Sequence, residues 1–193
     1  MTKAACRRQL RLRLRQMSMK ERRAQSRLIV QRLGELPAYM EATVIYGFYP
    51  TETEVDIRPL LQEALQRGKT VALPRIEADD RMVFIRIASL EDVRRGTYNI
   101  MEPIGTKIIT APGLILVPGL GFQADGKRIG HGKGYYDRYL RLYPDLRPVA
   151  VCFREQLVTG LPVEEHDISI PQVIIGEDDD SKRNGRTGKG SIL

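Results

Sequence analysis

The residues best suited to binding or catalysis form a basic, glycine-rich stretch, GKRIGHGKGYYD, at positions 126–137. It follows an apolar run, Leu114 to Val117, which is typical of a buried strand. Glycines let backbone N–H groups approach an anion closely, and Arg128 and Lys133 add full positive charges. The helical spacing that begins after the loop predicts a helix N-terminus, which also attracts anions. A strand, a basic loop and a helix start in this order favour a phosphate-binding site.

This interpretation has alternatives. The glycines could serve only turn geometry in a surface loop whose Arg128 and Lys133 are merely solvated. The loop is not a P-loop, because five residues separate Gly126 from Gly132 and Gly134 replaces the magnesium-binding Ser or Thr. Asp137 lies four residues after Lys133. Its carboxylate is suited either to Mg²⁺ or to an i, i+4 ion pair with that lysine on one helix face.

The stretch from Val117 to Leu140 resembles the signature of 5-formyltetrahydrofolate cyclo-ligases, also called methenyltetrahydrofolate synthetases. In that signature a Pro-Gly-x-x-Phe turn leads through Gly-x-Arg-x-Gly-x-Gly-x-Gly-Tyr-Tyr-Asp into a helix. This chain has PGLGF followed by GKRIGHGKGYYD. The resemblance covers roughly residues 3 to 176. It implies a three-layer α/β fold around a mostly parallel central sheet, and an ATP-dependent ligase that converts 5-formyltetrahydrofolate to 5,10-methenyltetrahydrofolate, ADP and phosphate in one-carbon metabolism.

The chemistry implied by this resemblance explains the residue types. The formyl oxygen attacks the γ-phosphorus of ATP, N10 then closes the ring, and phosphate leaves. Neither step needs a covalent nucleophile. Both need positive charge, N–H donors, Mg²⁺ and close alignment of the reacting atoms.

The resemblance also implies roles for individual residues. Those expected to act in catalysis are Lys133, Tyr135, which would pack near the formyl group, and Arg128. Those expected to bind ATP are Lys3, Arg7, Arg128, Gly130, His131, Gly132, Lys133, Gly134, Tyr135 and Tyr136. Those expected to bind the folate substrate are Tyr49, Glu54, His131, Lys133 and Tyr135. Those expected to hold Mg²⁺ are Asp137 and Asp167.

Two of these assignments have structural alternatives. Glu54 is equally consistent with an exposed loop carboxylate near the N-terminus of a following helix. Asp167 follows His166, and a lone His-Asp pair is more often structural than catalytic. A catalytically reduced relative that holds RNA or a nucleotide is the alternative function.

The composition limits the class of protein. The chain of 193 residues suits one domain, and its 42% hydrophobic content, with no apolar run near eighteen residues, predicts a soluble protein that does not span a membrane. Cys6 and Cys152 are too few for a disulfide framework, so the cytosol is the default compartment. The net charge of +7 is a local feature, because residues 1–33 carry eleven Lys and Arg against one Glu.

The basic N-terminal segment is expected to form an amphipathic helix over residues 2–17. Lys3, Arg7, Arg11 and Arg15 then form one row at i, i+4 spacing, and a bound anion would relieve their repulsion. The row is open to four interpretations. The first is a solvated helix face, and the second is a nucleic-acid patch, which the absence of interleaved aromatic residues disfavours. The third is a mitochondrial presequence. The fourth, for Lys3 and Arg7, is the ATP contact that the resemblance implies.

The remaining pattern predicts a further helix opened by a capping box at Ser18 and Glu21, and a βαβ unit. That unit comprises a strand at 43–48, a helix at 57–67 with Asp56 as N-cap, and a strand at 70–73. The loop after its first strand is where open α/β sheets place ligands. We expect one domain over residues 1–176, a disordered tail at 177–193, and a monomer. The other predicted strands cover 82–88, 148–153 and 172–175.

Overall fold

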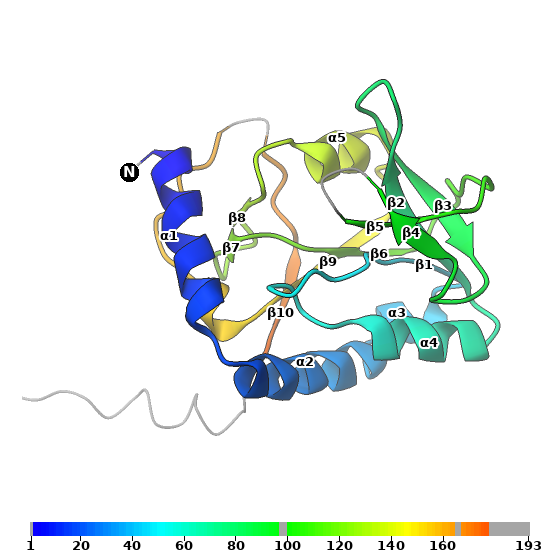
Figure 1. The fold of residues 1–193 in the computed structure, drawn as a ribbon, viewed down its shortest axis with the longest axis horizontal. Helices are drawn as coiled ribbons and strands as arrows, with labels where there is room; N and C mark the ends of the chain where they lie inside the picture. Colours follow the sequence, from blue (N-terminus) through cyan, green and yellow to red (C-terminus); the bar gives the residue numbers. More distant parts are fainter. Residues whose placement is uncertain (1, 97–99, 165–166, 178–193) are drawn as a thin grey trace, which may run out of the picture.

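The computed structural model describes residues 2–96, 100–164 and 167–177, which form an α/β fold around one central sheet (Figure 1). The strand order is β10-β9-β6-β1-β2-β3. All neighbouring strands are parallel except β2 and β3, so the predicted mostly parallel sheet is confirmed. The strands are β1 (Val44–Tyr46), β2 (Thr70–Ile76), β3 (Met82–Ile87), β6 (Leu114–Val117), β9 (Arg147–Cys152) and β10 (Gln172–Ile175).

Helices cover both faces of this sheet, which gives the three layers (Figure 1). The side chains of successive β6 residues pack on the two faces of the sheet in turn. Leu116 packs into the apolar cluster that contains Leu61 of α4, and Val117 into the cluster that contains Leu140 of α5. All of β6 is buried, as its uninterrupted apolar sequence predicts. The helices are α2 (Met19–Gly34), α3 (Pro37–Glu41) and α4 (Arg58–Gln66) on one face and α5 (Tyr135–Leu142) on the other.

A local sequence signal accounts for the start of α2. The predicted capping box is present, with the Glu21 N–H donating to Ser18 Oγ at 3.2 Å and the Ser18 N–H donating to Glu21 Oε2 at 2.8 Å. The prediction that Asp56 is the N-cap of α4 is wrong, because α4 begins at Arg58 with Ile57 as its N-cap; Asp56 Oδ1 still accepts from the Arg58 N–H at 3.1 Å. Helix α3 was not predicted. Its Pro37 fits the first turn of a new helix as well as the end of the previous one.

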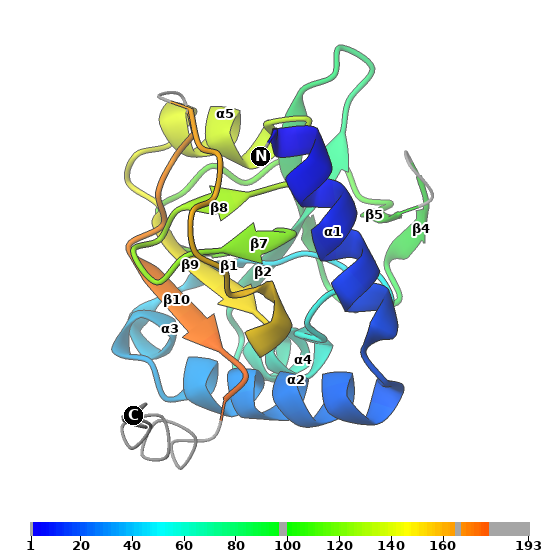
Figure 2. The same cartoon turned by 90° about the vertical axis from the view of Figure 1, so that its left-hand side faces the viewer.

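The basic N-terminal helix, α1 (Lys3–Gln16), is confirmed and packs into the fold. Its apolar stripe of Cys6, Leu10 and Leu14 is buried, while Arg11 and Arg15 are exposed. In Figure 2, α1 lies across the small hairpin of β7 (Gly121–Phe122) and β8 (Arg128–Ile129). Another two-stranded sheet, β4 (Val93–Arg95) with β5 (Met101–Pro103), lies beside β2 and β3 (Figure 1).

The topology creates a crevice between β1 and β6. The chain leaves β1 through α4 and returns as β2, which confirms the predicted βαβ unit. It leaves β6 through β7, β8 and α5 and returns as β9 on the other side. The two connections therefore diverge at the carboxyl ends of neighbouring parallel strands, where α/β sheets bind ligands. None of the helices in the described ranges is long and apolar enough to cross a bilayer.

Both cysteines are buried, and this predicts their reactivity. Cys6 is 3% exposed and Cys152 is fully buried. Burial, with a smaller contribution from the charge of Glu177, raises the pKa of the Cys152 thiol to about 12. The pKa of this thiol is thus higher in the folded protein than in the unfolded chain. Its contribution to the stability of the fold is therefore fully present below about pH 9 and is lost as the pH rises towards 12.

We therefore expect the native protein to be almost inert to the thiol reagent DTNB at pH 8. The same protein in 8 M urea should release two equivalents of the chromophore within minutes. Rapid labelling of the folded protein would contradict the buried placement of these thiols.

Candidate active site

The crevice contains a cavity of about 1060 Å³, and every residue predicted to bind ATP, folate or metal lines it. It is bounded by α1, the loops that follow β1 and β6, the segment from β8 to α5, and β2, β3 and β5. Segments far apart in sequence are thus brought to one place. The predicted residues at its wall are Lys3, Arg7, Tyr49, Glu54, Arg128, Gly130, His131, Gly132, Lys133, Gly134, Tyr135, Tyr136, Asp137 and Asp167.

The glycine-rich loop is held in a conformation that requires glycine. Gly132 has φ +109°, and a Cβ on it would lie 3.3 Å from Cζ of Arg7. Arg7 also donates from Nε to the Gly130 carbonyl at 3.0 Å, so helix α1 is fastened to the loop. Gly134 has φ +65° and directly precedes α5. The helix therefore begins at Tyr135, and the prediction that Lys133 shares a helix face with Asp137 is wrong.

Arg128 places a positive charge deep in the wall of the cavity. Its side chain is 4% exposed, and Nη2 lies 3.0 Å from Oδ1 of Asp137. The angles of this ion pair are poor, because within the described part of the chain Nε and Nη2 make no hydrogen bond. The Tyr136 ring centroid lies 5.8 Å from the Arg128 guanidinium. The buried Tyr136 hydroxyl also has no hydrogen-bond partner among the described residues. These buried donors of Arg128 and Tyr136 thus lack an acceptor among the described residues, and each unsatisfied buried donor costs about 1–3 kcal/mol.

The electrostatics of Tyr136 reflect this environment. Burial is the largest cause that raises the pKa of its phenol, and the nearby charge of Glu54 adds to it. The Arg128 cation opposes the shift. The phenol therefore stays protonated and remains a hydrogen-bond donor throughout the physiological range.

The two predicted metal ligands are engaged with cations or backbone donors. Asp137 Oδ1 accepts from the Ile168 N–H at 3.0 Å, besides pairing with Arg128. Asp167 Oδ2 accepts from Lys3 Nζ and from the Glu164 N–H, both at 2.7 Å. The alternative predicted for Asp137 was an i, i+4 ion pair with Lys133, but the ion pair that the structure shows is with Arg128.

Lys3 is held by two acids, since its Nζ also lies 3.1 Å from Glu164 Oε2. Burial on its own would lower the pKa of Lys3, but the hydrogen bonds and charges of Asp167 and Glu164 outweigh burial and raise it. Among residues 2–96, 100–164 and 167–177, no group of three or more His, Cys, Asp or Glu could hold a metal by protein ligands alone. His166 lies outside these described residues.

The opposite wall is apolar and carries carboxylates. Ile76, Met82 and Met101 from β2, β3 and β5 line the cavity together with Glu102, and Glu54 lies between this wall and His131 of the glycine-rich loop. In Figure 1 these strands lie at the other side of the molecule from α1 and β8. The cavity therefore has a cationic side and an apolar side.

Glu54 makes hydrogen bonds within the loop that follows β1. Its Oε2 accepts from the Thr51 N–H at 2.8 Å and from the Thr51 hydroxyl at 2.9 Å, and Oε1 lies 3.8 Å from His131 Nε2. The Glu54 side chain is only 14% exposed, so its alternative as an exposed loop carboxylate is wrong.

Sequence reasoning missed several residues of the wall. Glu102 is 8% exposed, with Oε1 3.4 Å from the Ile76 N–H, but its position beside Pro103 indicates only a turn. Arg138 lies three residues after Tyr135 on α5, and helical periodicity alone would have placed both on one face. The apolar residues of β2 and β3 carry no local signal of a site, because ordinary core strands have the same composition.

Comparison with known proteins agrees with this geometry. A model of the 5-formyltetrahydrofolate cyclo-ligase family matches residues 1–176. The chain belongs to this family. It is similar to the 5-formyltetrahydrofolate cyclo-ligase of Mus musculus, with 32% identity over 187 residues that cover 89% of this chain and 92% of the mouse protein.

Solved structures carry the same cyclo-ligase fold. The NMR structure of the Aquifex aeolicus 5,10-methenyltetrahydrofolate synthetase has a TM-score of 0.80 and 30% identity, and covers 92% of this chain and 91% of its own. The structure of a 5,10-methenyltetrahydrofolate synthetase from Mycoplasma pneumoniae has a TM-score of 0.71 and 25% identity, and covers 92% of this chain and 100% of its own. The resemblance in the glycine-rich motif is thus confirmed, and the alternative of a reduced RNA- or nucleotide-binding relative is not favoured.

The Arg128–Asp137 pair makes a testable contribution to the stability of this cyclo-ligase family member. Replacing Asp137 by Ala leaves a nearly buried guanidinium without its anion and should lower the free energy of unfolding by about 3 kcal/mol. Asp137→Asn should cost less, because its amide oxygen still accepts from the Ile168 N–H. Urea unfolding followed by circular dichroism measures both.

The matched control is Glu41→Ala, which breaks an exposed ion pair between Glu41 and Arg147. We expect no measurable change in its unfolding midpoint, since exposed pairs contribute little. Equal midpoints for Asp137→Ala and Glu41→Ala would show that the buried pair does not support the fold.

Proposed function

We propose that this protein uses ATP to convert 5-formyltetrahydrofolate to 5,10-methenyltetrahydrofolate, with ADP and phosphate as the other products. One observation carries the proposal: a single cavity joins a cationic glycine loop to an apolar wall beside the carboxylates of Glu54 and Glu102. A triphosphate and a folate need these two surfaces side by side, because the reaction brings a γ-phosphorus to a formyl oxygen. Membership of the cyclo-ligase family supports the same reaction.

The cationic side suits the phosphates of ATP. Backbone N–H groups of residues 130–134 and the charges of Lys3, Arg7 and Lys133 would bind the phosphate oxygens. Arg128 is too deeply buried to act chiefly by contact, so its role is a fixed positive charge behind the loop. Tyr135 and Tyr136, in the first turn of α5, would complete the ATP site.

The apolar side suits the pterin ring of the folate. A pterin is flat and presents N–H donors at its edge, so Glu54 would accept from it while Ile76 and Met82 pack against its faces. Tyr49 would contribute from the same loop as Glu54. His131 and Lys133 lie in the glycine loop and would reach both substrates, which places the reacting atoms near Tyr135.

The proposed reaction requires orientation and charge more than protein nucleophiles. The formyl oxygen attacks the γ-phosphorus and ADP leaves. N10 then attacks the activated formyl carbon, loses its proton, and phosphate departs. Lys133 and Arg128 would stabilise the negative charge on the transferred phosphoryl group, and Tyr135 would hold the formyl group in line. Neither Cys6 nor Cys152 lines the cavity, which agrees with a route without a covalent enzyme intermediate.

Asp137 and Asp167 are the proposed magnesium-binding residues. Mg²⁺ in nucleotide sites commonly takes one or two carboxylates, with phosphate oxygens and waters as its other ligands, so two carboxylates at the cavity wall fit this donor set. When bound, the ion would neutralise charge on the phosphates.

We further propose that residues 1–176 act as one domain and one monomeric enzyme. Helix α1 supplies Lys3 and Arg7 to the cavity, so the proposed activity requires this helix to be retained and not cleaved as a mitochondrial presequence. A retained α1 cannot serve as a cleaved presequence, so we propose the cytosol over the alternative of the mitochondrion.

Lys133 provides the sharpest test of the mechanism. Lys133→Ala should lower kcat about 100-fold or more, as expected when a preorganised charge at a phosphoryl group is lost. The absorbance of 5,10-methenyltetrahydrofolate, in a mixture of protein, ATP, Mg²⁺ and 5-formyltetrahydrofolate, measures the rate. Lys127→Ala, which removes an exposed lysine paired with Asp125 in the preceding turn, is the control and should retain full activity. Unchanged turnover in Lys133→Ala would refute the role of this residue.

Removal of Mg²⁺ tests the metal proposal. We expect EDTA to abolish formation of 5,10-methenyltetrahydrofolate and added Mg²⁺ to restore it. Asp167→Asn should raise the Mg²⁺ concentration needed for half-maximal rate several-fold, because a neutral amide is a weaker magnesium ligand. Glu164→Gln also alters the surroundings of Lys3 but removes no proposed ligand, so its Mg²⁺ dependence should match that of the unaltered protein. Identical Mg²⁺ curves for the two variants would exclude Asp167 as a ligand.

A further inference from the structure

Asp80 occupies an unusual backbone position at the tip of the β2–β3 hairpin. Its φ of 60° makes it the only non-glycine residue in the left-handed region among the described residues. Aspartate tolerates that conformation better than most side chains, but it is still disfavoured. The turn is closed by hydrogen bonds from the Asp80 N–H to the Glu77 carbonyl and from the Glu77 N–H to the Arg81 carbonyl. A three-residue hairpin loop normally has its last residue in the left-handed region, so the turn itself accounts for this φ and leaves the Asp80 carboxylate free to make contacts outside the turn.

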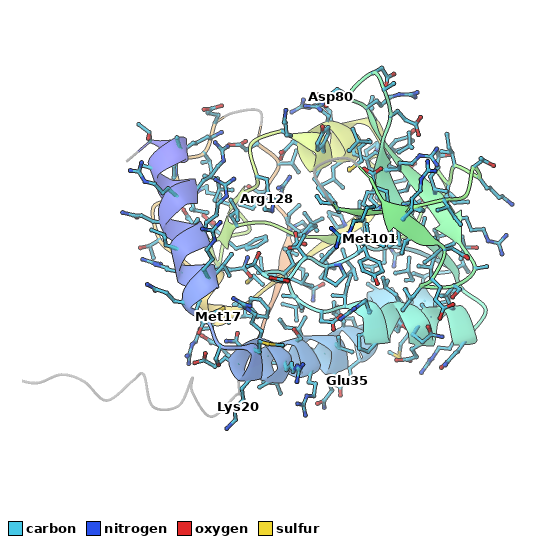
Figure 3. The ribbon with its side chains drawn as sticks, in the orientation of Figure 1. Met17, Lys20, Glu35, Asp80, Met101 and Arg128 are labelled. Atoms are coloured by element: carbon cyan, nitrogen blue, oxygen red, sulfur yellow. The ribbon has the colours of Figure 1, made fainter. Side chains whose placement is uncertain are left out.

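Asp80 contacts α5, across 55 residues of sequence. Its carboxylate Oδ1 accepts from the Tyr135 hydroxyl at 2.5 Å. Its backbone carbonyl accepts from Arg138 Nη2 at 3.4 Å, and Oδ2 lies 4.0 Å from the same nitrogen. Figure 3 labels Asp80 at the end of the molecule that carries α5.

Arg138 extends these contacts to the glycine loop. It donates from Nη1 to the Lys133 carbonyl at 2.6 Å, and its guanidinium lies 5.2 Å from the centroid of the Tyr135 ring. Asp80, Tyr135 and Arg138, which we call the hairpin latch, thus join the hairpin, the first turns of α5 and the phosphate-side loop. Both helix residues line the cavity, as do Ile76 and Met82 at the two ends of the hairpin turn.

We propose that Asp80 is a positioning residue that acts through Tyr135, an inference that rests on the proposed function. The Tyr135 hydroxyl donates its proton to the Asp80 carboxylate in a hydrogen bond, so this proton does not take part in the reaction. The same hydrogen bond fixes the orientation of the Tyr135 ring. Tyr135 therefore serves as an oriented ring at the reacting formyl group and not as a general acid. The same hydrogen bond holds the hairpin against α5, where its strands complete the apolar wall.

The kinetic test uses Asp80→Gly, which removes the carboxylate but suits the left-handed backbone. We expect kcat to fall about tenfold while KM for ATP changes less than twofold, because a misaligned group beside the reacting atoms slows the reaction without touching the phosphate contacts. Asp80→Asn keeps an acceptor oxygen and tolerates the same φ, so it should restore most of the rate. Asp79→Ala removes the neighbouring carboxylate, which pairs with Arg81, and should leave both parameters unchanged.

A double-mutant cycle separates positioning from a general effect of the hairpin. In the Tyr135→Phe background, Asp80→Gly should cause no further loss of kcat, because its partner hydroxyl is already absent. Losses that multiply in the double variant, or an Asp79→Ala loss equal to that of Asp80→Gly, would overturn the proposal. So would full activity in Asp80→Gly.

Proteolysis tests the latch without any substrate. Trypsin should cut after Arg81 several-fold faster in Tyr135→Phe and Arg138→Ala than in the unaltered protein, because both release the hairpin tip without altering the sequence around Arg81. Cleavage after Lys127, in a turn outside the latch, should be unchanged. Equal rates after Arg81 in all three proteins would overturn the latch. An unaltered protein that forms no 5,10-methenyltetrahydrofolate would instead overturn the proposed function, and the cleavage rates would then decide the latch alone.

Discussion

The buried charge of Arg128 is the constraint on which the site depends. A guanidinium that is 4% exposed must have an anion nearby, and Asp137 supplies it from the first turn of α5. Because Asp137 also accepts from the Ile168 N–H, and the Gly126 carbonyl accepts from the Ile170 N–H, three segments converge on one ion pair. The glycine loop between Arg128 and Asp137 is therefore anchored at both ends. The loop lines the cavity.

The parallel sheet decides where this loop can lie. Strands β1 and β6 are neighbours whose connections pass over opposite faces of the sheet, so their carboxyl ends border a crevice that no covering helix fills. The loop carrying Glu54 follows β1, and the segment leading to Arg128 follows β6. Helix α1 closes a third side through Arg7, whose guanidinium packs on Gly132 and donates to Gly130. A side chain at Gly132 would meet both a left-handed backbone and this packed arginine.

The basic N-terminus shows how far pattern reasoning extends. Helical spacing places Lys3, Arg7, Arg11 and Arg15 in one row, and the structure confirms that helix. Only Lys3 and Arg7 line the cavity, whereas Arg11 and Arg15 are exposed, because the helix runs past the cavity as it crosses β7 and β8. Repetition along a sequence cannot reveal where a neighbouring element stops. The partners of Lys3, Asp167 and Glu164, are likewise contributed by a segment more than 160 residues away.

Local order was determined by the sequence itself: the buried strand at 114–117, the capping box at Ser18 and the glycine motif with its family resemblance all depend on residues close together in the chain. The tertiary structure alone decided which partners those residues have. Asp137 pairs with Arg128 instead of Lys133 because Gly134 delays the helix start to Tyr135, which leaves Lys133 in the loop. Glu102 and Asp80 reach the site only through strand pairing and a hairpin turn. Such contacts join residues that are distant in sequence, and their formation depends on the packing of the whole sheet, which no local pattern encodes.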